Sequence, residues 1–477
     1  MPWRFCAACL MIRIEILDPH TRRIPVQGRM KVPVTLFISA AIRVEEEALR
    51  QLMDAASLDA EALILATPDI HTGYGVPIGS VFASPRMLSP SAVGYDINCG
   101  MRLLTTPLTM ETCRPPELAA AIHAHIPLGE GKRNLRCLPL ELAGILKSGL
   151  KATGKLLRRQ NLGEDDITRV EDEGSLAGSS DALSPRALER GLPQLGTLGG
   201  GNHFIEIQTV TEIADEMRAE RLGLRKGQIT VMIHSGSRGL GHETARDYMK
   251  LAGEQMRRRS EEPPNSQLFT LPADTPEGRA YLGAMNAAAN FAFANRQVMA
   301  LLTKRACGEL YGSRTAARVR TLYDVTHNIA KQEHHRGTRY FVHRKGATRA
   351  FDAARMGGTP FADCGQPVLI PGSMGSASYV LLGCPGSARS LFSVNHGAGR
   401  RLSRSAAAGK KGRPGAISEA GFQASMQGIH LICDDPRRIR EEAPAAYKDI
   451  KEVVEVVVGA GLALPVAKMK PLAVLKG

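Results

Sequence analysis

Short apolar runs, each closed by a turn that contains glycine or histidine, recur along most of this 477-residue chain. Clear examples are Leu63-Ile64-Leu65, Val231-Met232-Ile233, Tyr340-Phe341-Val342 and Val368-Leu369-Ile370. Runs of this length between glycine-rich turns are typical of β-strands. The turns with chemically active side chains extend from residue 69 to residue 476, so a cut into independent domains would divide one site. We therefore predict a single large α+β domain of mixed β-sheets with peripheral helices.

Local patterns predict further elements around these strands. Helix-forming residues fill 140–159 and 280–305, although glycines weaken the first of these predictions. The acidic stretch 163–183 is typical of a solvated loop, and the basic stretch 403–415 of a flexible segment. The remaining predictions are a strand at 11–16, a helix at 44–53, a disordered extension at 1–10 and one folded domain over 11–477.

The charge balance and composition narrow the class of protein. Lys and Arg total 61 against 47 Asp and Glu, a net charge of +14, which serves solubility or binds a polyanion such as nucleic acid. Charge alone favours neither interpretation. No run of about 18 uncharged apolar residues occurs, and nine cysteines in this length do not make a disulfide scaffold. We expect a cytoplasmic protein with reduced thiols and no membrane association.

Four turns carry side chains that bind metals. Asp96 and Cys99 lie three residues apart in one turn, His203 lies on a glycine loop, His234 follows a strand, and His327 begins a possible helix. One thiolate, one carboxylate and three imidazoles form a coherent ligand set in which the thiolate can bridge two ions. Two ions about 3.5–4 Å apart can clamp the oxygens of a phosphoryl transfer. Ligand type leaves zinc and manganese open, and a single structural zinc with unrelated histidines is the alternative.

A further histidine exceeds what a two-metal site needs. His396 begins a turn of glycine and arginine, Gly397-Ala398-Gly399-Arg400. A neutral imidazole can attack an electrophilic phosphorus and hold it as a phosphoramidate. From the residues alone, His396 is equally well explained as a nucleophile or as a plain ligand.

Cations and glycine loops near these turns favour phosphate binding. The backbone N–H groups of 372–375 and 397–399 can approach a phosphate closely. Arginine offers a phosphate a planar fork, and lysine offers a point charge. The candidate cations are Arg190, Arg238, Lys345, Arg349, Arg400 and Arg404.

Longer motifs in this chain resemble the RtcB family of tRNA-splicing and RNA-repair ligases. They are PDIHTGYGVPIG, VGYDINCGMRLL, LGTLGGGNHFIEIQ, HSGSRGLG, DVTHNIAK, HRKGATRAF, PGSMGSASYVLLG, NHGAGRRLSR and VAKMKPLAVLKG. The motifs follow the family's order, and the similarity runs from about residue 11 onward. The resemblance implies an RtcB-like fold around a deep metal-containing cleft.

The resemblance also implies a reaction. RNA ending in a 3′-phosphate or 2′,3′-cyclic phosphate would be joined to RNA with a 5′-hydroxyl, in tRNA splicing or RNA repair. The implied cofactors are GTP and two Mn(II) ions, with zinc or cobalt as substitutes in vitro. The implied intermediates are a histidine–GMP adduct and an RNA-3′-pp-5′-G end. An archease-type activator is a further partner to test for.

Roles are implied residue by residue. Asp96, Cys99, His203, His234 and His327 match the family's metal ligands, with Cys99 bridging, and His396 matches the histidine that carries GMP. The implied guanylate contacts are Asn202, Phe204, Glu206, Asn328, Ser373, Ser378, Gly397, Ala398, Gly399, Tyr447 and Lys476. Arg190, Arg238, Lys345, Arg400 and Arg404 would hold phosphates of the RNA or nucleotide.

Some residues depart from the family pattern, and two rival functions remain. Ser91 and Ala92 stand where the family has glycines before Asp96, His334 is an outer-shell candidate, and residues 1–10 have no family counterpart. One rival is a metal-dependent phosphoesterase or cyclic phosphodiesterase, which needs neither His396 nor the guanine contacts. The other is a non-catalytic RNA-binding module, which needs no metal.

Overall fold

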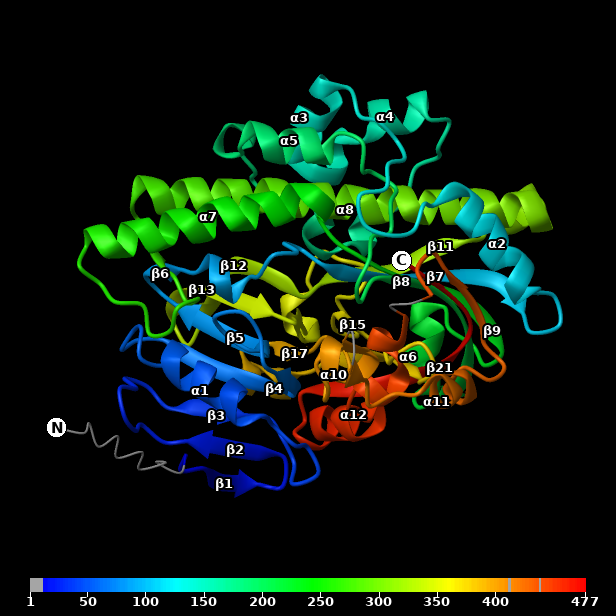
Figure 1. The fold of residues 1–477 in the computed structure, drawn as a ribbon. Helices are drawn as coiled ribbons and strands as arrows, with labels where there is room; N and C mark the ends of the chain where they lie inside the picture. Colours follow the sequence, from blue (N-terminus) through cyan, green and yellow to red (C-terminus); the bar gives the residue numbers. More distant parts are fainter. Residues whose placement is uncertain (1–11, 411–412, 437–438) are drawn as a thin grey trace.

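Two large sheets form the centre of the computed structural model, which describes residues 12–410, 413–436 and 439–477 (Figure 1). The first sheet has the order β1 (Glu15–Asp18), β2 (Thr21–Ile24), β3 (Val34–Leu36), β4 (Leu63–His71), β5 (Ile78–Ser84), β13 (Thr338–Lys345) and β12 (Asn328–His335). The second has the order β11 (Arg320–Thr326), β7 (Gly100–Thr109), β9 (Gln228–Ser235), β8 (Phe204–Ile213), β21 (Ala463–Lys476), β16 (Ser378–Gly383) and β15 (Pro367–Ile370). An eighth strand, β20 (His430–Cys433), pairs with β21.

Smaller elements connect and cover the sheets. Three two-stranded pairs are β6 (Met87–Leu88) with β10 (Leu271–Pro272), β14 (Ala347–Arg349) with β17 (Ser393–Asn395), and β18 (Gly409–Lys410) with β19 (Arg413–Pro414). The helices are α1 (Glu46–Ala55), α2 (Pro115–His125), α3 (Pro139–Ser148), α4 (Gly154–Arg159), α5 (Pro185–Gly191), α6 (Glu216–Leu222), α7 (Arg238–Arg258), α8 (Pro276–Tyr311), α9 (Ser313–Ala316), α10 (Arg404–Ala408), α11 (Glu419–Ser425) and α12 (Ile450–Gly459).

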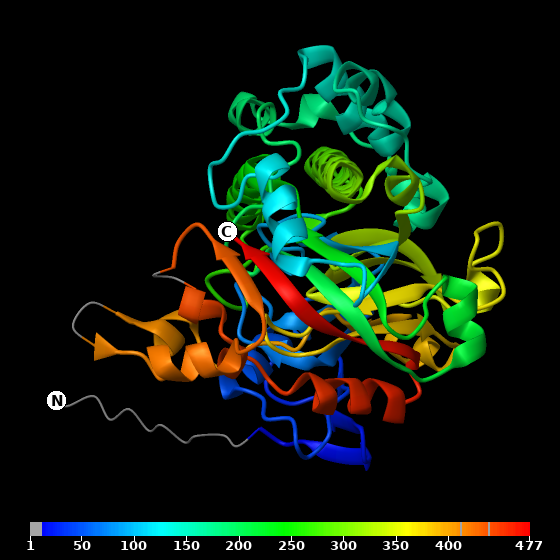
Figure 2. The ribbon, with the colours of Figure 1, turned by 90° about the vertical axis from the view of Figure 1, so that its right-hand side faces the viewer.

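The long helix α8 belongs to the core. Its first turn is capped by Thr275, whose side chain accepts a hydrogen bond from the Gly278 N–H, and Pro276 opens the helix. Every residue from Ala287 to Thr303 is buried, as expected for a helix packed on all sides. Figures 1 and 2 show α7 and α8 lying on the sheets, with α3, α4 and α5 outside them. The buried middle of α8 therefore reaches the sheet that carries the site.

Most predicted elements are confirmed. The single α+β domain of mixed sheets is observed, and the four apolar runs lie in β4, β9, β13 and β15. The helix expected at 44–53 is α1, and that expected at 280–305 lies within the longer α8. The disordered extension predicted at 1–10 lies outside the described residues.

Other predictions are wrong in their details. His327 lies between β11 and β12, not at the start of a helix. The helix predicted at 140–159 breaks at Gly149, whose φ of +56° ends α3. The segment 163–183 is not solvated throughout, because Glu171 is 1% exposed and pairs with Lys331. Within the described residues, the strand predicted at 11–16 begins only at Glu15, and residue 11 lies outside them. The segment 403–415 contains α10 and the β18–β19 pair.

Within the described parts of the chain, no helix has both the length and the apolar composition that crossing a bilayer requires.

Candidate metal centre and adjoining cavities

Neighbouring strands of the second sheet bring the predicted metal ligands together at one end of these strands. The strands β7, β9 and β8 are adjacent and antiparallel, and the register places both Met101 and Phe204 opposite His234. Cys99 lies just before β7 and His203 directly precedes β8. Because the end of β9 lies beside the beginnings of β7 and β8, the three side chains meet.

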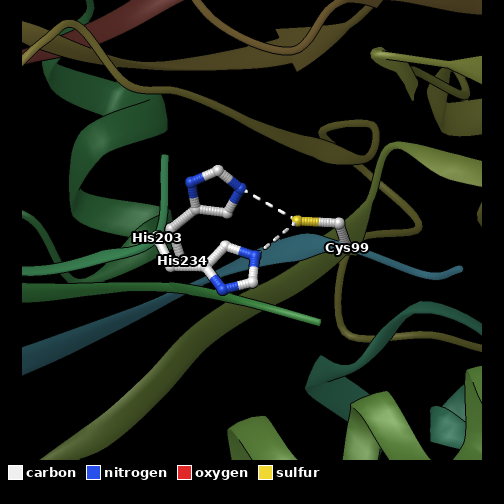
Figure 3. A group of neighbouring side chains, drawn as sticks. All are labelled: Cys99, His203 and His234. Carbon is white, nitrogen blue, oxygen red and sulfur yellow. Dashed lines mark hydrogen bonds between the residues drawn. The ribbon is translucent and has the colours of Figure 1, made fainter. Parts of the chain in front are cut away.

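Cys99, His203 and His234 form a compact group that could hold a metal ion (Figure 3). The Cys99 Sγ lies 3.4 Å from His203 Nε2 and 3.1 Å from His234 Nε2, and all three residues are buried. Asp96 Oδ2 lies 2.8 Å from His203 Nε2. His327 Nε2 lies 3.3 Å from His234 Nε2. The five predicted ligands thus lie in one cluster.

Hydrogen bonds on the far side of two rings prepare them to bind a cation. His203 Nδ1 lies 3.0 Å from the Leu198 carbonyl oxygen, and His234 Nδ1 lies 3.1 Å from that of Asn202. A carbonyl oxygen only accepts, so each Nδ1 carries a proton, and each Nε2 would present its lone pair to a bound cation. Burial lowers the pKa of His234 and of His327 well below the ordinary value, which keeps both rings neutral.

The thiol completes a donor set that fits a metal ion. Burial raises the pKa of Cys99 well above its ordinary value, so the thiol alone keeps its proton. A coordinated cation deprotonates a thiol outright. Thiolate and imidazole suit zinc, and the carboxylate of Asp96 admits manganese.

Arg296 ties the ligand turns to α8 and was missed by sequence reasoning. Its Nη1 donates to the carbonyl oxygens of Asn98 at 2.7 Å and Ser235 at 3.0 Å, which adjoin two of the ligands. Its Nη2 donates to Asp324 Oδ1 at 2.8 Å, three residues before a third ligand. Both charged side chains of this pair are fully buried. Arg296 is the one charged residue in the alanine-rich stretch 280–303, and this isolation was the signal available in the sequence.

His396 lies beside the ligand cluster and is oriented by a carboxylate. Its ring centroid is 4.8 Å from that of His327. Asp69 Oδ2 lies 2.6 Å from His396 Nδ1. Although burial would raise the pKa of Asp69, the charge and hydrogen bond of His396 hold it below its ordinary value. When the ring is neutral, this carboxylate favours the form with the proton on Nδ1 and the lone pair on Nε2. Asp69 was missed as a site residue, although it lies in the PDIHTG motif.

His396 separates two cavities, which we call cavity A and cavity B. Cavity A is lined mainly by Phe204, Ser373, Met374, Glu442, Tyr447 and Lys476. Cavity B is lined mainly by Tyr95, Asp96, Arg190, Arg238, His242 and Lys345. The residues lining both are Ile78, Asn202, His396 and Arg404. A group bound to His396 could therefore be approached both from cavity A and from cavity B.

Most residues expected around a guanylate lie in cavity A. They are Asn202, Phe204, Ser373, Gly397, Ala398, Gly399, Tyr447 and Lys476. Asn328 lines cavity B, whereas Glu206 and Ser378 line neither cavity. Gln208 Nε2 donates to Glu206 Oε2 at 2.7 Å and to Ser378 Oγ at 3.0 Å. Burial raises the pKa of Glu206 to about 7.

The cations expected to hold phosphates already have partners in the protein. Lys345 Nζ donates to the carbonyl oxygens of Tyr74, Val76 and Ser91, which uses all three of its N–H groups. Burial lowers the pKa of Lys345 to about 7. The other partners are Glu243 for Arg190, Thr197 for Arg238, and Glu442 for Arg400 and Arg404. Arg349 lies outside both cavities and pairs with Asp172.

Glu442 is a second residue that no motif pointed to. In cavity A it lies 3.2 Å from both Arg400 and Arg404 and 3.8 Å from Lys476, and it accepts a hydrogen bond from the Tyr447 hydroxyl. Burial would raise the pKa of Glu442, but these cations lower it to about 2. The carboxylate is therefore an anion inside the cavity that the family resemblance gives to GMP.

The departures from the family pattern leave the ligand cluster intact. Ser91 Oγ donates to the Gln267 carbonyl oxygen at 2.7 Å and accepts from the Phe269 N–H at 3.2 Å. The serine thus anchors the turn that precedes Asp96. His334, the outer-shell candidate, is exposed and lines neither cavity.

Together, the fold and the site define an α+β protein with a buried cysteine–histidine cluster that could hold a metal ion and an oriented histidine between two cavities. The family model described as tRNA-splicing ligase RtcB matches residues 51–477. A Thermococcus kodakarensis protein named tRNA-splicing ligase RtcB is 40% identical over 490 residues, which cover 98% of this chain and 99% of that protein. An Aeropyrum pernix protein of the same name is 37% identical, with 98% and 100% covered. A Mycobacterium bovis protein named RNA-splicing ligase RtcB is 41% identical, with 86% and 96% covered. The chain belongs to the RtcB family.

Proposed function

We propose that this chain is a GTP- and Mn(II)-dependent RNA ligase that joins RNA 3′-phosphate or 2′,3′-cyclic phosphate ends to 5′-hydroxyl ends. The observation that carries the proposal is the position of His396. Asp69 orients its ring, its Nε2 is available as a nucleophile, and it lies between cavity A and the metal-ligand cluster. Membership of the RtcB family and the names of the relatives support RNA as the substrate.

His396 acts first as the nucleophile. Its Nε2 attacks the α-phosphorus of GTP, an N–P bond forms, and the bond to the departing pyrophosphate breaks. Asp69 keeps the proton on Nδ1 and stabilises the positive charge that the ring acquires. Asp96, Cys99, His203, His234 and His327 would hold the metal ions, which when bound would polarise phosphate oxygens and neutralise their charge.

The RNA ends then react in turn. A 2′,3′-cyclic phosphate is first hydrolysed to a 3′-phosphate. An oxygen of the 3′-phosphate attacks the GMP phosphorus, the N–P bond breaks, and His396 is restored. The product end is RNA-3′-pp-5′-G. The 5′-hydroxyl attacks the RNA phosphorus, GMP leaves, and a 3′,5′ phosphodiester forms.

The guanylate in this proposal occupies cavity A. Tyr447 stacks on the base. Glu206 is buried beside Gln208 and lines neither cavity, so its carboxylate would have to turn towards cavity A to accept from the two adjacent N–H donors on the guanine edge. Adenine presents an acceptor there, so ATP would leave the carboxylate unpaired and be rejected. The activity would take place in the cytoplasm, with an archease-type activator as a candidate partner.

One labelling experiment tests the proposal against its rivals. The protein is incubated with Mn(II) and GTP labelled at the α-phosphate, run on a denaturing gel, and assayed for joining of a 3′-phosphate RNA to a 5′-hydroxyl RNA. We expect a covalent label that is lost in His396→Ala. The matched control is His334→Ala, because His334 is exposed and lines neither cavity.

The other outcomes contradict the proposal. Release of phosphate from RNA without any label on the protein would identify a phosphoesterase. A gel shift of RNA without label or hydrolysis would identify a binding module. Metal analysis of protein purified without chelator would test manganese against zinc.

A further inference from the structure

Tyr95 is the one aromatic residue among the large apolar side chains that are exposed in the described parts of the chain. It is 37% exposed, and it directly precedes the predicted ligand Asp96. It lines cavity B together with His203, His327 and His396. A ligand in this cavity could cover the exposed part of the ring, and an aromatic side chain gains free energy when it is buried.

Two neighbouring rings make Tyr95 part of a larger aromatic surface. The Tyr74 ring packs edge-on against it, with centroids 5.3 Å apart and planes at 63°. The His242 ring lies 6.3 Å away with its plane at 27°, which is close to parallel. His242 is exposed and lies on α7 four residues after Arg238, hence on the same face of the helix. We call Tyr74, Tyr95 and His242 the aromatic platform.

Cations share cavity B with the aromatic platform. Arg190, Arg238 and Arg404 line the same cavity, and so do three of the predicted metal ligands, Asp96, His203 and His327. A flat apolar surface beside a cationic wall fits a ligand that joins an aromatic ring to a phosphate, which describes a nucleotide. Unpaired bases of RNA are bound in this way by other proteins, through stacking on aromatic side chains and contacts to the backbone.

We propose that cavity B receives an RNA end and that the unpaired base of its terminal nucleotide stacks on Tyr95, flanked by His242. The inference rests on the proposed function, which places the guanylate in cavity A on the other side of His396. Stacking on a ring face tolerates all four bases. The platform therefore selects an unpaired end rather than a sequence, and a blunt duplex end would bind poorly.

The test is a thermodynamic cycle in which the Tyr95 ring and the terminal base of the RNA are removed separately and then together. Binding of fluorescent single-stranded RNA to the full chain with Mn(II) is measured by anisotropy. One RNA carries the 3′-phosphate and another the 5′-hydroxyl, and each is made with its terminal base and with an abasic terminal ribose. We expect Tyr95→Ala to weaken binding of the base-containing RNA by about 5- to 150-fold for the strand that uses the platform. With the abasic RNA the same variant should lose nothing further.

Two more variants separate stacking from a general effect on folding. Tyr95→Phe keeps the ring and should retain the wild-type affinity. Tyr379→Ala removes a tyrosine that lines neither cavity and serves as the matched control. If the effect of Tyr95→Ala depends on the terminal base in one of the two RNAs, the result supports the aromatic platform and shows which RNA end binds there. An equal loss with and without the base in both strands, or a loss in Tyr95→Phe as large as that in Tyr95→Ala, would overturn it.

The proposed function is tested separately, by covalent GMP labelling of the same protein preparations. Covalent GMP labelling needs no RNA, so it reports on the proposed reaction of His396 with GTP independently of RNA binding. Labelling without coupling between the Tyr95 ring and the terminal base would exclude the aromatic platform and would still support the proposed ligase. Coupling between the ring and the base without any GMP labelling would support the aromatic platform and exclude the proposed ligase.

Discussion

Replacing Arg296 with methionine should destabilise the fold and loosen the metal-ligand cluster together. The arginine donates to both carboxylate oxygens of Asp324 and to the carbonyl oxygens of Asn98 and Ser235. Methionine keeps much of the stem volume but offers no donor. Asp324 would retain Arg102, whose Nε lies 2.8 Å from Oδ2.

The magnitude follows from these contacts. Removing one partner of a buried ion pair costs about 3–5 kcal/mol. Each carbonyl left without a donor costs about 1–3 kcal/mol, whereas the remaining Arg102 reduces the cost at Asp324. We expect a loss of about 3–5 kcal/mol in the free energy of unfolding, a large part of the 5–15 kcal/mol of a typical domain.

The assay is urea unfolding followed by circular dichroism, together with Mn(II) binding by calorimetry under native conditions. Arg305→Met is the matched control, because Arg305 lies on the same helix and donates to the carbonyl oxygens of Gln160 and Asn161, away from the ligands. Only Arg296→Met should weaken Mn(II) binding, by at least about tenfold. A loss of stability below about 1 kcal/mol, or equal metal affinity in both variants, would refute the reasoning.

Three further predictions concern single side chains. Asp69→Asn should slow GMP labelling by about 10²- to 10⁴-fold, because the amide no longer fixes the proton on His396 Nδ1; labelling at the wild-type rate would contradict this. Binding of Mn(II) should release a proton from Cys99, whose pKa burial raises, so affinity should rise with pH. Calorimetry in two buffers of different ionisation enthalpy should detect that proton in the wild type and not in Cys99→Ala, which should also form no GMP adduct. Burial raises the pKa of Glu206 to about 7, so the folded state gains stability from the protonated form at low pH and loses it as the pH rises to 7. Glu206→Gln should therefore raise the melting temperature relative to wild type more at pH 8 than at pH 5, and should relax the preference for GTP over ATP; equal shifts at both pH values would exclude the stability effect.

Local patterns predicted the strands and the ligand-bearing turns because short stretches of sequence determine both. An apolar run with a glycine turn specifies a strand end, and antiparallel pairing of β7, β9 and β8 then brings the ligands together. The same patterns failed where a partner far away in the sequence decides the structure. The segment 163–183 was expected to be solvated, but Glu171 is buried because it pairs with Lys331, which lies 160 residues further along the chain.

The missed residues share this cause. Arg296 acts through Asn98 and Asp324, and Glu442 acts through Arg400 and Lys476. Each contact joins segments that only the folded sheets bring together. Periodicity describes one element at a time, so it identifies ligands on turns but not the groups that position them.

The place of β21 in the second sheet has a consequence for how this protein is made. Although it is the last strand in sequence, it lies between β8 and β16 in the interior of the sheet. While a ribosome is still producing that strand, β8 presents an unpaired edge, which is a template for pairing with other chains. Because the polypeptide emerges from its N-terminus, the edge beside His203 stays open until β21 itself has left the ribosome. We expect the nascent protein to depend on chaperones during this interval and to aggregate when they are scarce.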